Sequence, residues 1–359
     1  MIWIAGSPSP HGNAGRSTKP RALGSPGLQA RGSLLIELRS ALPSRATKLY
    51  QSANESSRPG DLSIHTDGAG QILAQVETDH APVRAEIPLV GIDASRNLRI
   101  QVSWDAGTAD LWVGAPSLDF IVRHAPLAVA PRIDLDALTA WIDETPASCD
   151  IAFAALSDDV QPVGPMPGLA AGTLVTTPSG PVPIETLARG DIVIADQSDG
   201  TTTTVPVLEA VRCTLPARGT FQPVRLFAPS FGLRSDLILN ANQVLSLSGP
   251  DVEYLFSQER VLALAGHLVS PRTGRIVTSG DTVVWHHLLL PGNSNLKVGN
   301  CSIVALRAGR LRRHPIAHAH SLLADLQRRD LPHPTAVSQQ VLSEFETRTL
   351  LDQLSFGSS

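Results

Sequence analysis

Apolar and polar residues alternate in several short runs of this chain, and this period of two predicts β-strands. The alternation is clear at Leu34–Leu38, Leu62–Thr66 and Ile72–Val76, where every second side chain would point to a buried face. Two further alternating runs, Leu98–Trp104 and Asp110–Val113, flank a Gly-containing turn and predict a hairpin. Short strands at this spacing, with no helix between them, favour a β-sandwich of the jelly-roll type.

The size and charge of the chain narrow the class of protein. Its 359 residues suggest two domains, and 42% apolar residues can supply a core to each. The net charge of −4 gives no field that would collect phosphates, so no nucleic-acid partner is expected. No apolar run approaches the roughly 18 residues of a membrane span. We therefore expect a soluble protein that is cytoplasmic, or exported without a recognisable signal peptide.

The cysteines and histidines favour neither a metal nor a cofactor. Cys149, Cys213 and Cys301 lie far apart, which excludes a disulfide scaffold and a structural zinc site of the usual kind. Three histidines between residues 314 and 320 have a spacing that could hold a metal, but Pro315 interrupts the geometry. Solvent-facing histidines at the start of a helix are the favoured interpretation, and we expect no metal and no cofactor.

Changes in composition divide the chain into four parts. Residues 1–31 are rich in Gly, Pro, Ser and Arg and are expected to form a flexible leader. The prolines of Asp158–Pro167 forbid both helix and central strand and predict a domain boundary. The expected organisation is all-β, with a short helical end: a lectin-like β-sandwich at 32–160, a second β-domain at 166–305 and a helical tail at 306–359.

Helical periodicity is found in three ranges of the sequence. One helical turn or two is expected at Asp134–Asp143, and longer helices are expected at Ile316–Arg329 and Thr335–Leu351. The run Arg307–Arg313, just before them, contains four arginines. It could bind an anion, although a solvated linker face is the more common role of such a run.

The most specific segment extends from Gly172 to Asp196. It predicts a strand, a tight Pro-Ser-Gly turn, a short return and a buried strand at Ile192–Ala195. The order of Gly172-Thr, Ile184-Glu-Thr-Leu, Gly190-Asp and Ile192-Val resembles the opening of the Hedgehog/intein (Hint) domain family, in the form found in bacterial Hint-containing proteins. Weaker similarity continues to Gly299-Asn300. The resemblance implies a horseshoe-shaped β-fold whose two ends approach each other, an arrangement that permits self-processing.

The resemblance also implies where the self-processing residues should stand. The nucleophile position of the family falls on Gly168, and no residue from Gly168 to Ala171 has a side-chain heteroatom. The family histidine, three residues after a polar residue, falls on Gln243 in the run Asn240-Ala-Asn-Gln243. Because a glutamine amide cannot shuttle a proton near neutral pH, we expect no catalytic residues and a non-cleaving scaffold or interaction module.

An alternative function is self-cleavage at Asn300-Cys301. An Asn followed by Cys resembles the end of an intein, where Asn cyclises to a succinimide and releases the downstream segment. His287 is the candidate assisting group, although the residue before Asn300 is Gly299 where the family usually has His. His287, Asn300 and Cys301 are therefore the candidate catalytic residues of this alternative.

A second alternative places the function in the N-terminal half. The strand Leu98–Asp105 and the following Leu111–Val113 resemble laminin-G or concanavalin-like sandwiches. Such sandwiches bind carbohydrate or protein, often through exposed aromatic residues. Trp104 shares a face with core residues, whereas Trp112 could be core or ligand platform.

Overall fold

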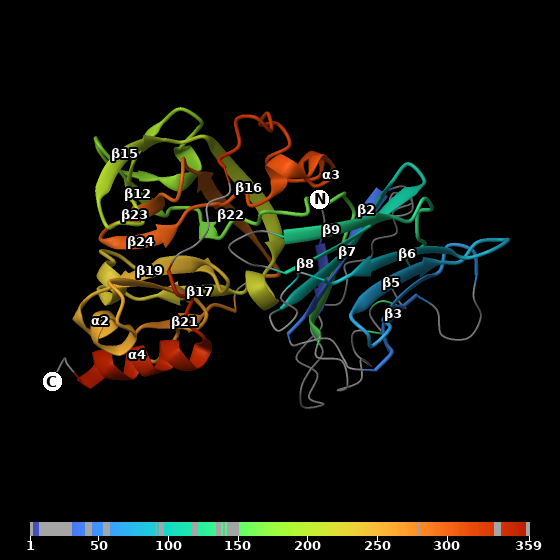
Figure 1. Ribbon diagram of the computed structural model, residues 1–359, viewed down its shortest axis with the longest axis horizontal. Helices are drawn as coiled ribbons and strands as arrows, with labels where there is room; N and C mark the ends of the chain where they lie inside the picture. Colours follow the sequence, from blue (N-terminus) through green and yellow to red (C-terminus); the bar gives the residue numbers. More distant parts are fainter. Residues whose placement is uncertain are drawn as a thin grey trace. The chain divides into compact units, whose positions relative to one another are not determined.

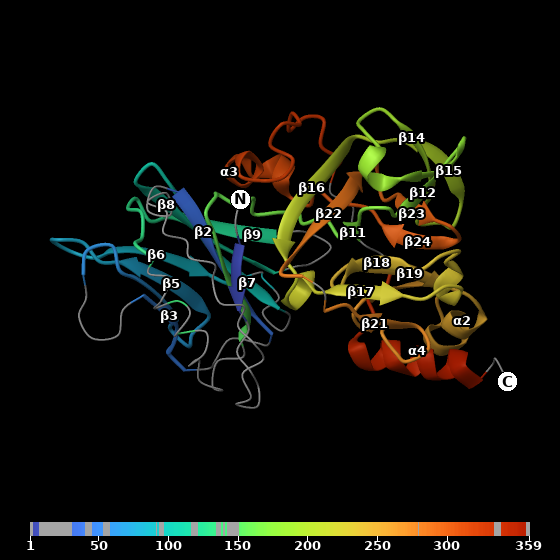
Figure 2. The ribbon, with the colours of Figure 1, turned by 180° about the vertical axis from the view of Figure 1, so that it is seen from behind.

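The computed structural model describes residues 3–6, 31–39, 45–52, 58–90, 92, 97–115, 121–133, 138, 141, 151–278, 280–333 and 339–356. The chain forms two compact units, Met1–Val163 (unit 1) and Gly164–Ser359 (unit 2). Each unit is built mainly from antiparallel β-sheets, as predicted, with few short helices (Figures 1 and 2). The division between the units lies within the proline-rich stretch 158–167.

Unit 1 contains two antiparallel sheets. The larger sheet has the order β1 (Trp3–Gly6), β10 (Ile151–Ser157), β2 (Arg31–Leu38), β7 (Leu98–Asp105), β8 (Thr108–Ala115) and β9 (Ile121–Pro126). The smaller sheet has the order β3 (Thr47–Gln51), β4 (Leu62–Thr66), β5 (Gln71–Val76) and β6 (Val83–Pro88). One hydrophobic core contains residues of both sheets, among them Ile36, Ile64 and Val102. The alternating runs therefore form the predicted sandwich.

The hairpin β7–β8 shows how the sequence specifies this sheet. Strand pairing ends at Asp105 and Thr108, which leaves Ala106 and Gly107 as a two-residue turn. Both turn residues have positive φ, +48° at Ala106 and +88° at Gly107. Such turns match the right-handed twist of the flanking strands. Trp104 lies in the core, as expected, while Trp112 is buried on the other face of β8 beside the His124 ring.

Two predictions for unit 1 need correction or fall outside the described residues. Trp3–Gly6 of the expected flexible leader is a strand that pairs with β10, because backbone hydrogen bonding to a distant strand does not depend on local composition. Residues 7–30 lie outside the described residues. Of the helix expected at 134–143, the structure describes Leu138 and Trp141, and both belong to the core region.

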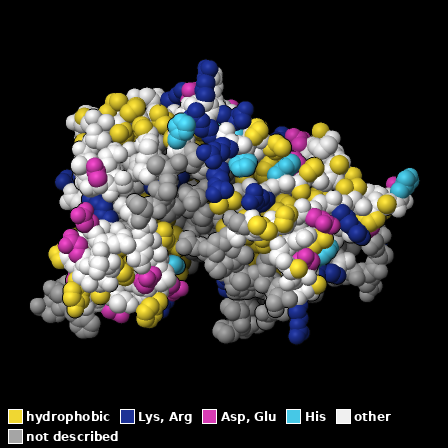
Figure 3. Space-filling model, in the orientation of Figure 1, with side chains coloured by type: hydrophobic (Ala, Val, Ile, Leu, Met, Phe, Trp, Pro, Cys, Tyr) yellow, Lys and Arg dark blue, Asp and Glu magenta, His cyan; other side chains and the backbone are white. Residues whose placement is uncertain are grey.

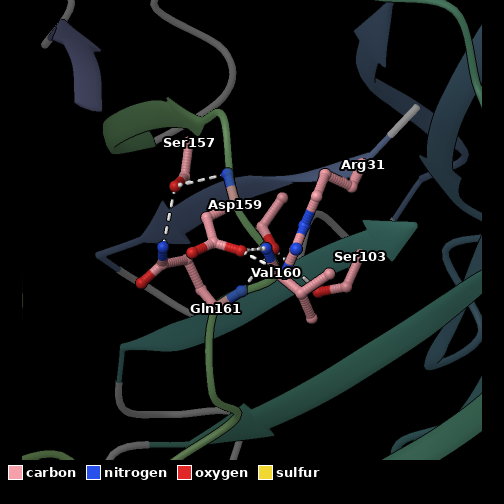
Figure 4. Close-up of polar contacts among 7 residues, drawn as sticks. Arg31, Ser103, Ser157, Asp159, Val160 and Gln161 are labelled. Atoms are coloured by element: carbon pink, nitrogen blue, oxygen red, sulfur yellow. Dashed lines mark hydrogen bonds and ion pairs between the residues drawn. The ribbon is translucent and has the colours of Figure 1, made fainter. Parts of the chain in front are cut away.

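A polar network fixes the segment that follows β10 against the larger sheet (Figure 4). The Gln161 backbone N–H donates to Ser33 Oγ (2.8 Å), and its side-chain Nε2 donates to Ser157 Oγ (2.7 Å). The Arg31 guanidinium lies 2.5 Å from Asp159 Oδ1. The stretch after β10 is thus neither helix nor strand, as its prolines require, but its hydrogen bonds are specific.

Unit 2 has two six-stranded sheets and one two-stranded sheet. The first sheet has the order β16 (Glu209–Pro216), β22 (Thr282–Leu289), β11 (Leu169–Ala170), β18 (Leu237–Asn240), β17 (Pro223–Leu226) and β21 (Gly274–Ile276). The second has the order β15 (Thr202–Pro206), β14 (Ile192–Asp196), β23 (Asn295–Val298), β24 (Cys301–Val304), β19 (Val244–Ser248) and β20 (Arg260–Leu264), and β12 (Leu174–Thr177) pairs with β13 (Gly180–Pro183). Residues from these sheets share a second core.

The helical end is shorter than predicted. The α-helices are α2 (Pro250–Phe256), α3 (Pro315–Ala319) and α4 (Glu344–Phe356), and the 3₁₀ turns are η2 (Ile184–Thr186), η3 (Gly219–Phe221), η4 (Ser230–Gly232) and η5 (Leu311–Arg313). The helix expected at 316–329 stops at α3, because the Ser321 hydroxyl binds the His318 carbonyl and the Leu323 N–H in a turn. Of the helix expected at 335–351, residues 335–338 lie outside the described residues. The described helix α4 begins at Glu344, because Val341 forms a β-bridge with Leu262. None of the helices formed by described residues is long and apolar enough to cross a membrane.

Candidate functional site

Gly168 lies where three strands of unit 2 come together. The next residue, Leu169, pairs with Leu239 of β18 on one side and His286 of β22 on the other. Extending the antiparallel register by one residue sets Gly168 opposite His287. On the β18 side, the Asn240 backbone N–H donates to the Gly168 carbonyl (2.9 Å). Sheet pairing therefore brings together Gly168 and Asn240, two positions singled out by the family resemblance, and the candidate histidine His287.

The space beside Gly168 is filled. A Cβ atom added there would lie under 3.0 Å from Gln243 Oε1 and 3.0 Å from Asn240 Nδ2. Gln243 itself is 7% exposed. The Gln243 side chain thus occupies the volume that any side chain at residue 168 would need.

Asn240 holds the peptide bond that precedes Gly168. Its Nδ2 donates to the Pro167 carbonyl oxygen (2.9 Å). That oxygen belongs to the carbonyl that a nucleophile at residue 168 would attack in an active member of the family. Asn240 Oδ1 is buried and has no hydrogen-bond partner among the described residues. Asn240 therefore orients the carbonyl that precedes Gly168, a residue without a side chain.

Gln243 and His287 meet at the backbone of Val304. Gln243 Nε2 donates to the Val304 carbonyl (3.0 Å) and, less favourably, to the Val244 carbonyl (3.2 Å). His287 Nδ1 accepts from the Leu288 N–H (3.0 Å), which leaves the ring proton on Nε2. Burial lowers the pKa of His287 to about 3, and a hydrogen bond to the Val304 backbone opposes this shift only in part. His287 is therefore a neutral, enclosed imidazole.

Asn300 and Cys301 lie in a different place from this cluster. Val298 pairs with Cys301, so Gly299 and Asn300 form the tight turn between β23 and β24. Cys301 and Val304 are at opposite ends of β24, about 10 Å apart at the usual rise of a strand. Burial, with a smaller contribution from the charge of Asp196, raises the pKa of Cys301 to about 12. The structure brings His287 together with Gly168 and Gln243, and places the Asn300-Cys301 pair at the far end of the strand.

The sequence also singled out the histidines at 314–320 as a possible metal site. Of the three histidines at 314–320, His318 is buried and hydrogen-bonded to the Leu326 carbonyl (2.9 Å), so the expectation of solvent-facing histidines is wrong for this residue. In the part of the chain that the structure describes, no group of three His, Cys, Asp or Glu side chains could hold a metal ion. Val304 was not among the sequence candidates, because it contributes a backbone carbonyl and its side chain carries no signal.

Comparison with known proteins relates unit 2 to one family. Residues 167–309 match the family model described as the Hint domain. A bacterial intein-like domain from Clostridium thermocellum is 18% identical, with a TM-score of 0.30, over 99% of its length and 40% of this chain. A variant of the Ssp DnaB mini-intein is 12% identical, with a TM-score of 0.27, over 93% of its length and 39% of this chain. The LG1-3 region of the laminin alpha2 chain is 11% identical, with a TM-score of 0.23, over 53% of its length and 77% of this chain. No curated protein matches the sequence.

Proposed function

Because this chain is a Hint-domain protein, with that domain at residues 167–309, we propose that the domain no longer cleaves the chain and serves as a scaffold or interaction module. The observation that carries the proposal is the filled space at Gly168. Amide-to-ester or amide-to-thioester conversion needs a side-chain nucleophile next to the scissile carbonyl. Gly168 offers none, and Gln243 and Asn240 occupy the place of its Cβ.

The surrounding groups support the same proposal. Gln243 Nε2 is engaged by backbone carbonyls, and an amide neither takes up nor releases a proton near neutral pH. His287 could transfer protons only if it were reachable and titrated near the working pH. It is 3% exposed, and burial lowers its pKa to about 3. Carbonyl orientation by Asn240 alone supplies no bond-making step.

Cleavage by Asn cyclisation is the competing function. It would need the Asn300 side-chain nitrogen to attack its own carbonyl carbon and expel the Cys301 nitrogen. Both residues belong to the tight β23–β24 hairpin, where the Asn300 backbone N–H is held by the Gly232 carbonyl (3.0 Å). His287, the candidate assisting group, hydrogen-bonds at the opposite end of β24. These positions favour the non-cleaving function.

The test is intact-mass measurement on the purified full chain, with and without added thiol. We expect one species of 38.0 kDa in both conditions. A fragment beginning at residue 168 would overturn the proposal directly, and one beginning at Cys301 would establish Asn cyclisation. Asn300→Ala is the control for the second outcome, because it removes the cyclising side chain while keeping the hairpin.

Two further variants separate the missing groups. Gly168→Cys supplies a thiol but leaves Gln243 in place, so it should show no thiol-dependent cleavage. Gly168→Cys/Gln243→His supplies both groups that the family uses. Thiol-dependent cleavage of the single variant would show that proton transfer at residue 243 is not required.

The interaction role of unit 1 is less specific. Its described aromatic side chains are buried or half-buried, and Trp104 and Trp112 are each 1% exposed. This burial does not favour a carbohydrate platform of stacked aromatic rings. We propose a protein partner before a glycan, and binding of the full chain to a glycan array would reverse that order.

A further inference from the structure

One segment of unit 2 concentrates positive charge. Residues 307–333 contain six arginines and two aspartates, whereas the whole chain has a net charge of −4. Four of these arginines are exposed and define the basic surface: Arg310, Arg313, Arg328 and Arg329. Both aspartates are exposed as well, and Asp330 lies 3.9 Å from Arg329, so the surface keeps a net positive charge. Figure 3 shows Lys and Arg side chains gathered where Figure 1 places α3.

The basic surface is held together by the fold of its own segment. Arg312 Nη1 donates to the Leu331 carbonyl (2.9 Å), which ties η5 to the stretch after Arg328 and Arg329. The His318 ring binds the Leu326 carbonyl from α3 (2.9 Å). Ile316 of α3 is 54% exposed beside this charge. The surface is therefore an ordered one that combines arginine with an exposed apolar side chain.

A second surface of unit 2 has the opposite charge. The helices α2 and α4 and the residues that flank them carry the acidic surface, whose exposed carboxylates are Glu253, Glu259, Glu344 and Asp352. Of these, Glu344 is paired with the exposed Arg348 of the same helix (2.6 Å). Gln340 links the two helices, because it pairs with Gln258 (3.5 Å) and donates to Glu346 (2.9 Å).

Two aromatic side chains stand out from the acidic surface. Tyr254 of α2 and Phe345 of α4 are each 79% exposed. Large aromatic side chains are enriched at protein interfaces, as is arginine, and arginine also binds aromatic faces. The acidic surface therefore has the composition of a binding site for an arginine-rich partner.

The partner with matching chemistry is present in the same sequence. Within unit 2, α3 lies at the end opposite to α2 and α4 in both ribbon views (Figures 1 and 2). One copy cannot bring its own two surfaces together without unfolding unit 2. We infer that the basic surface of one copy binds the acidic surface of a second copy, which makes the interaction module self-associating. Because the two surfaces differ, the contact is head-to-tail and can propagate along a row of copies.

This assignment of a partner rests on the proposed interaction role, yet the two can fail separately. Intact mass reports cleavage, while sedimentation reports association. A chain that cleaves itself can still self-associate, and an uncleaved chain can still be a monomer.

The test is sedimentation velocity of the full chain over a wide concentration range. In about 0.01 M salt we expect the mean mass to rise with concentration, and in about 1 M salt, where screening acts within a few ångströms, we expect a monomer. Arg313→Glu/Arg328→Glu reverses the basic surface, and Glu253→Arg/Asp352→Arg reverses the acidic one. Each double variant should weaken association at least about tenfold, because like charges then face each other.

The decisive measurement is made on a mixture of the basic-reversed and the acidic-reversed variant. The basic-reversed chain keeps a native acidic surface and the acidic-reversed chain keeps a native basic surface, so the mixture should associate although neither variant does alone. A chain with all four changes should also recover association. Tyr254→Ser/Phe345→Ser should weaken association with no change in charge, and Arg58→Glu/Arg189→Glu, an exposed pair outside both surfaces, should have no effect.

Three results would overturn the inference. The first is a full chain that stays monomeric at every concentration in low salt. The second is association that survives both single-surface reversals, since that would place the contact elsewhere. The third is weaker association of the Arg58/Arg189 control, which would show that net charge, and not these two surfaces, governs the effect.

Discussion

Replacing Gly168 with alanine tests the filled space at the site most directly. Gly168 is not one of the glycines with positive φ, so alanine fits the backbone and any cost comes from packing. The new Cβ would overlap Gln243 Oε1 at less than 3.0 Å, while ordinary contacts begin near 3.4 Å. The Gln243 side chain must therefore move.

The magnitude follows from what Gln243 loses when it moves. Its Nε2 donates to the Val304 and Val244 carbonyls at 3.0 and 3.2 Å, and losing a buried hydrogen bond costs about 1–3 kcal/mol. Overpacking a core by one methyl group costs a similar amount, about 1–3 kcal/mol. A combined cost of about 2–6 kcal/mol corresponds to a drop in the midpoint of about 4–24 °C for a unit of this size.

The assay is calorimetry of the full chain during thermal unfolding, which can resolve the transition of unit 2. Gln243→Ala makes room for the Cβ, so Gly168→Ala should cost at least about 1 kcal/mol less in that background. A Gly168→Ala chain whose transitions all lie within about 1 °C of the parent would refute the reasoning, because the space would then be free for a nucleophile.

Three further outcomes are expected. The pKa of His287 is about 3 in the folded state against 6.5 for the free side chain, so the folded protein keeps this ring neutral. The free energy of unfolding should therefore fall by up to about 1.4 kcal/mol per pH unit as the pH is lowered below 6.5. In denaturant titrations, His287→Gln should flatten that slope. Asp191 is exposed and accepts one backbone N–H at 2.9 Å, so Asp191→Ala should cost about 0.5–1.5 kcal/mol, and a loss above about 3 kcal/mol would contradict this role. The pKa of the Cys301 thiol is raised to about 12. In a chain with Cys149→Ser and Cys213→Ser, this thiol should therefore resist alkylation until the protein unfolds, and rapid labelling of the folded protein would show that the thiol is accessible.

The sequence was most informative where structure depends on neighbouring residues. Alternation in Leu62–Thr66 and the turn at Ala106-Gly107 are local features, and the strands and hairpin follow from them. The strand Trp3–Gly6 was missed because its partner, β10, lies far along the chain. Composition averaged over residues 1–31 carries no information about such a partner.

The start of the last helix was missed for another reason. Periodicity placed it at Thr335, but Ser343 and Glu346 form a capping box: Glu346 N–H donates to Ser343 Oγ (3.2 Å) and Ser343 N–H donates to Glu346 Oε2 (2.7 Å). The Ser-x-x-Glu signal is present in the sequence and marks the helix start better than the apolar spacing does.

The sequence singled out side chains of the candidate site but none of its backbone groups. Spacing within the family pattern identified Gly168 and Gln243, and the structure sets them in contact. It could not identify the Val304 carbonyl on which Gln243 and His287 converge. Backbone atoms are common to all residues, so the fold and not the sequence pattern decides which carbonyl accepts.

The two-residue strand β11 has a consequence for how the chain is made. Leu169 pairs with Leu239 and His286, so its neighbours are synthesised long after it, the second on the order of ten seconds later at usual translation rates. Until then the segment around Gly168 has no sheet to join. Pairing strands that lie so far apart in the sequence is among the slow steps of folding. The central strand of this sheet is therefore among the first parts of unit 2 to be translated and cannot be paired on both edges until most of the unit has been made.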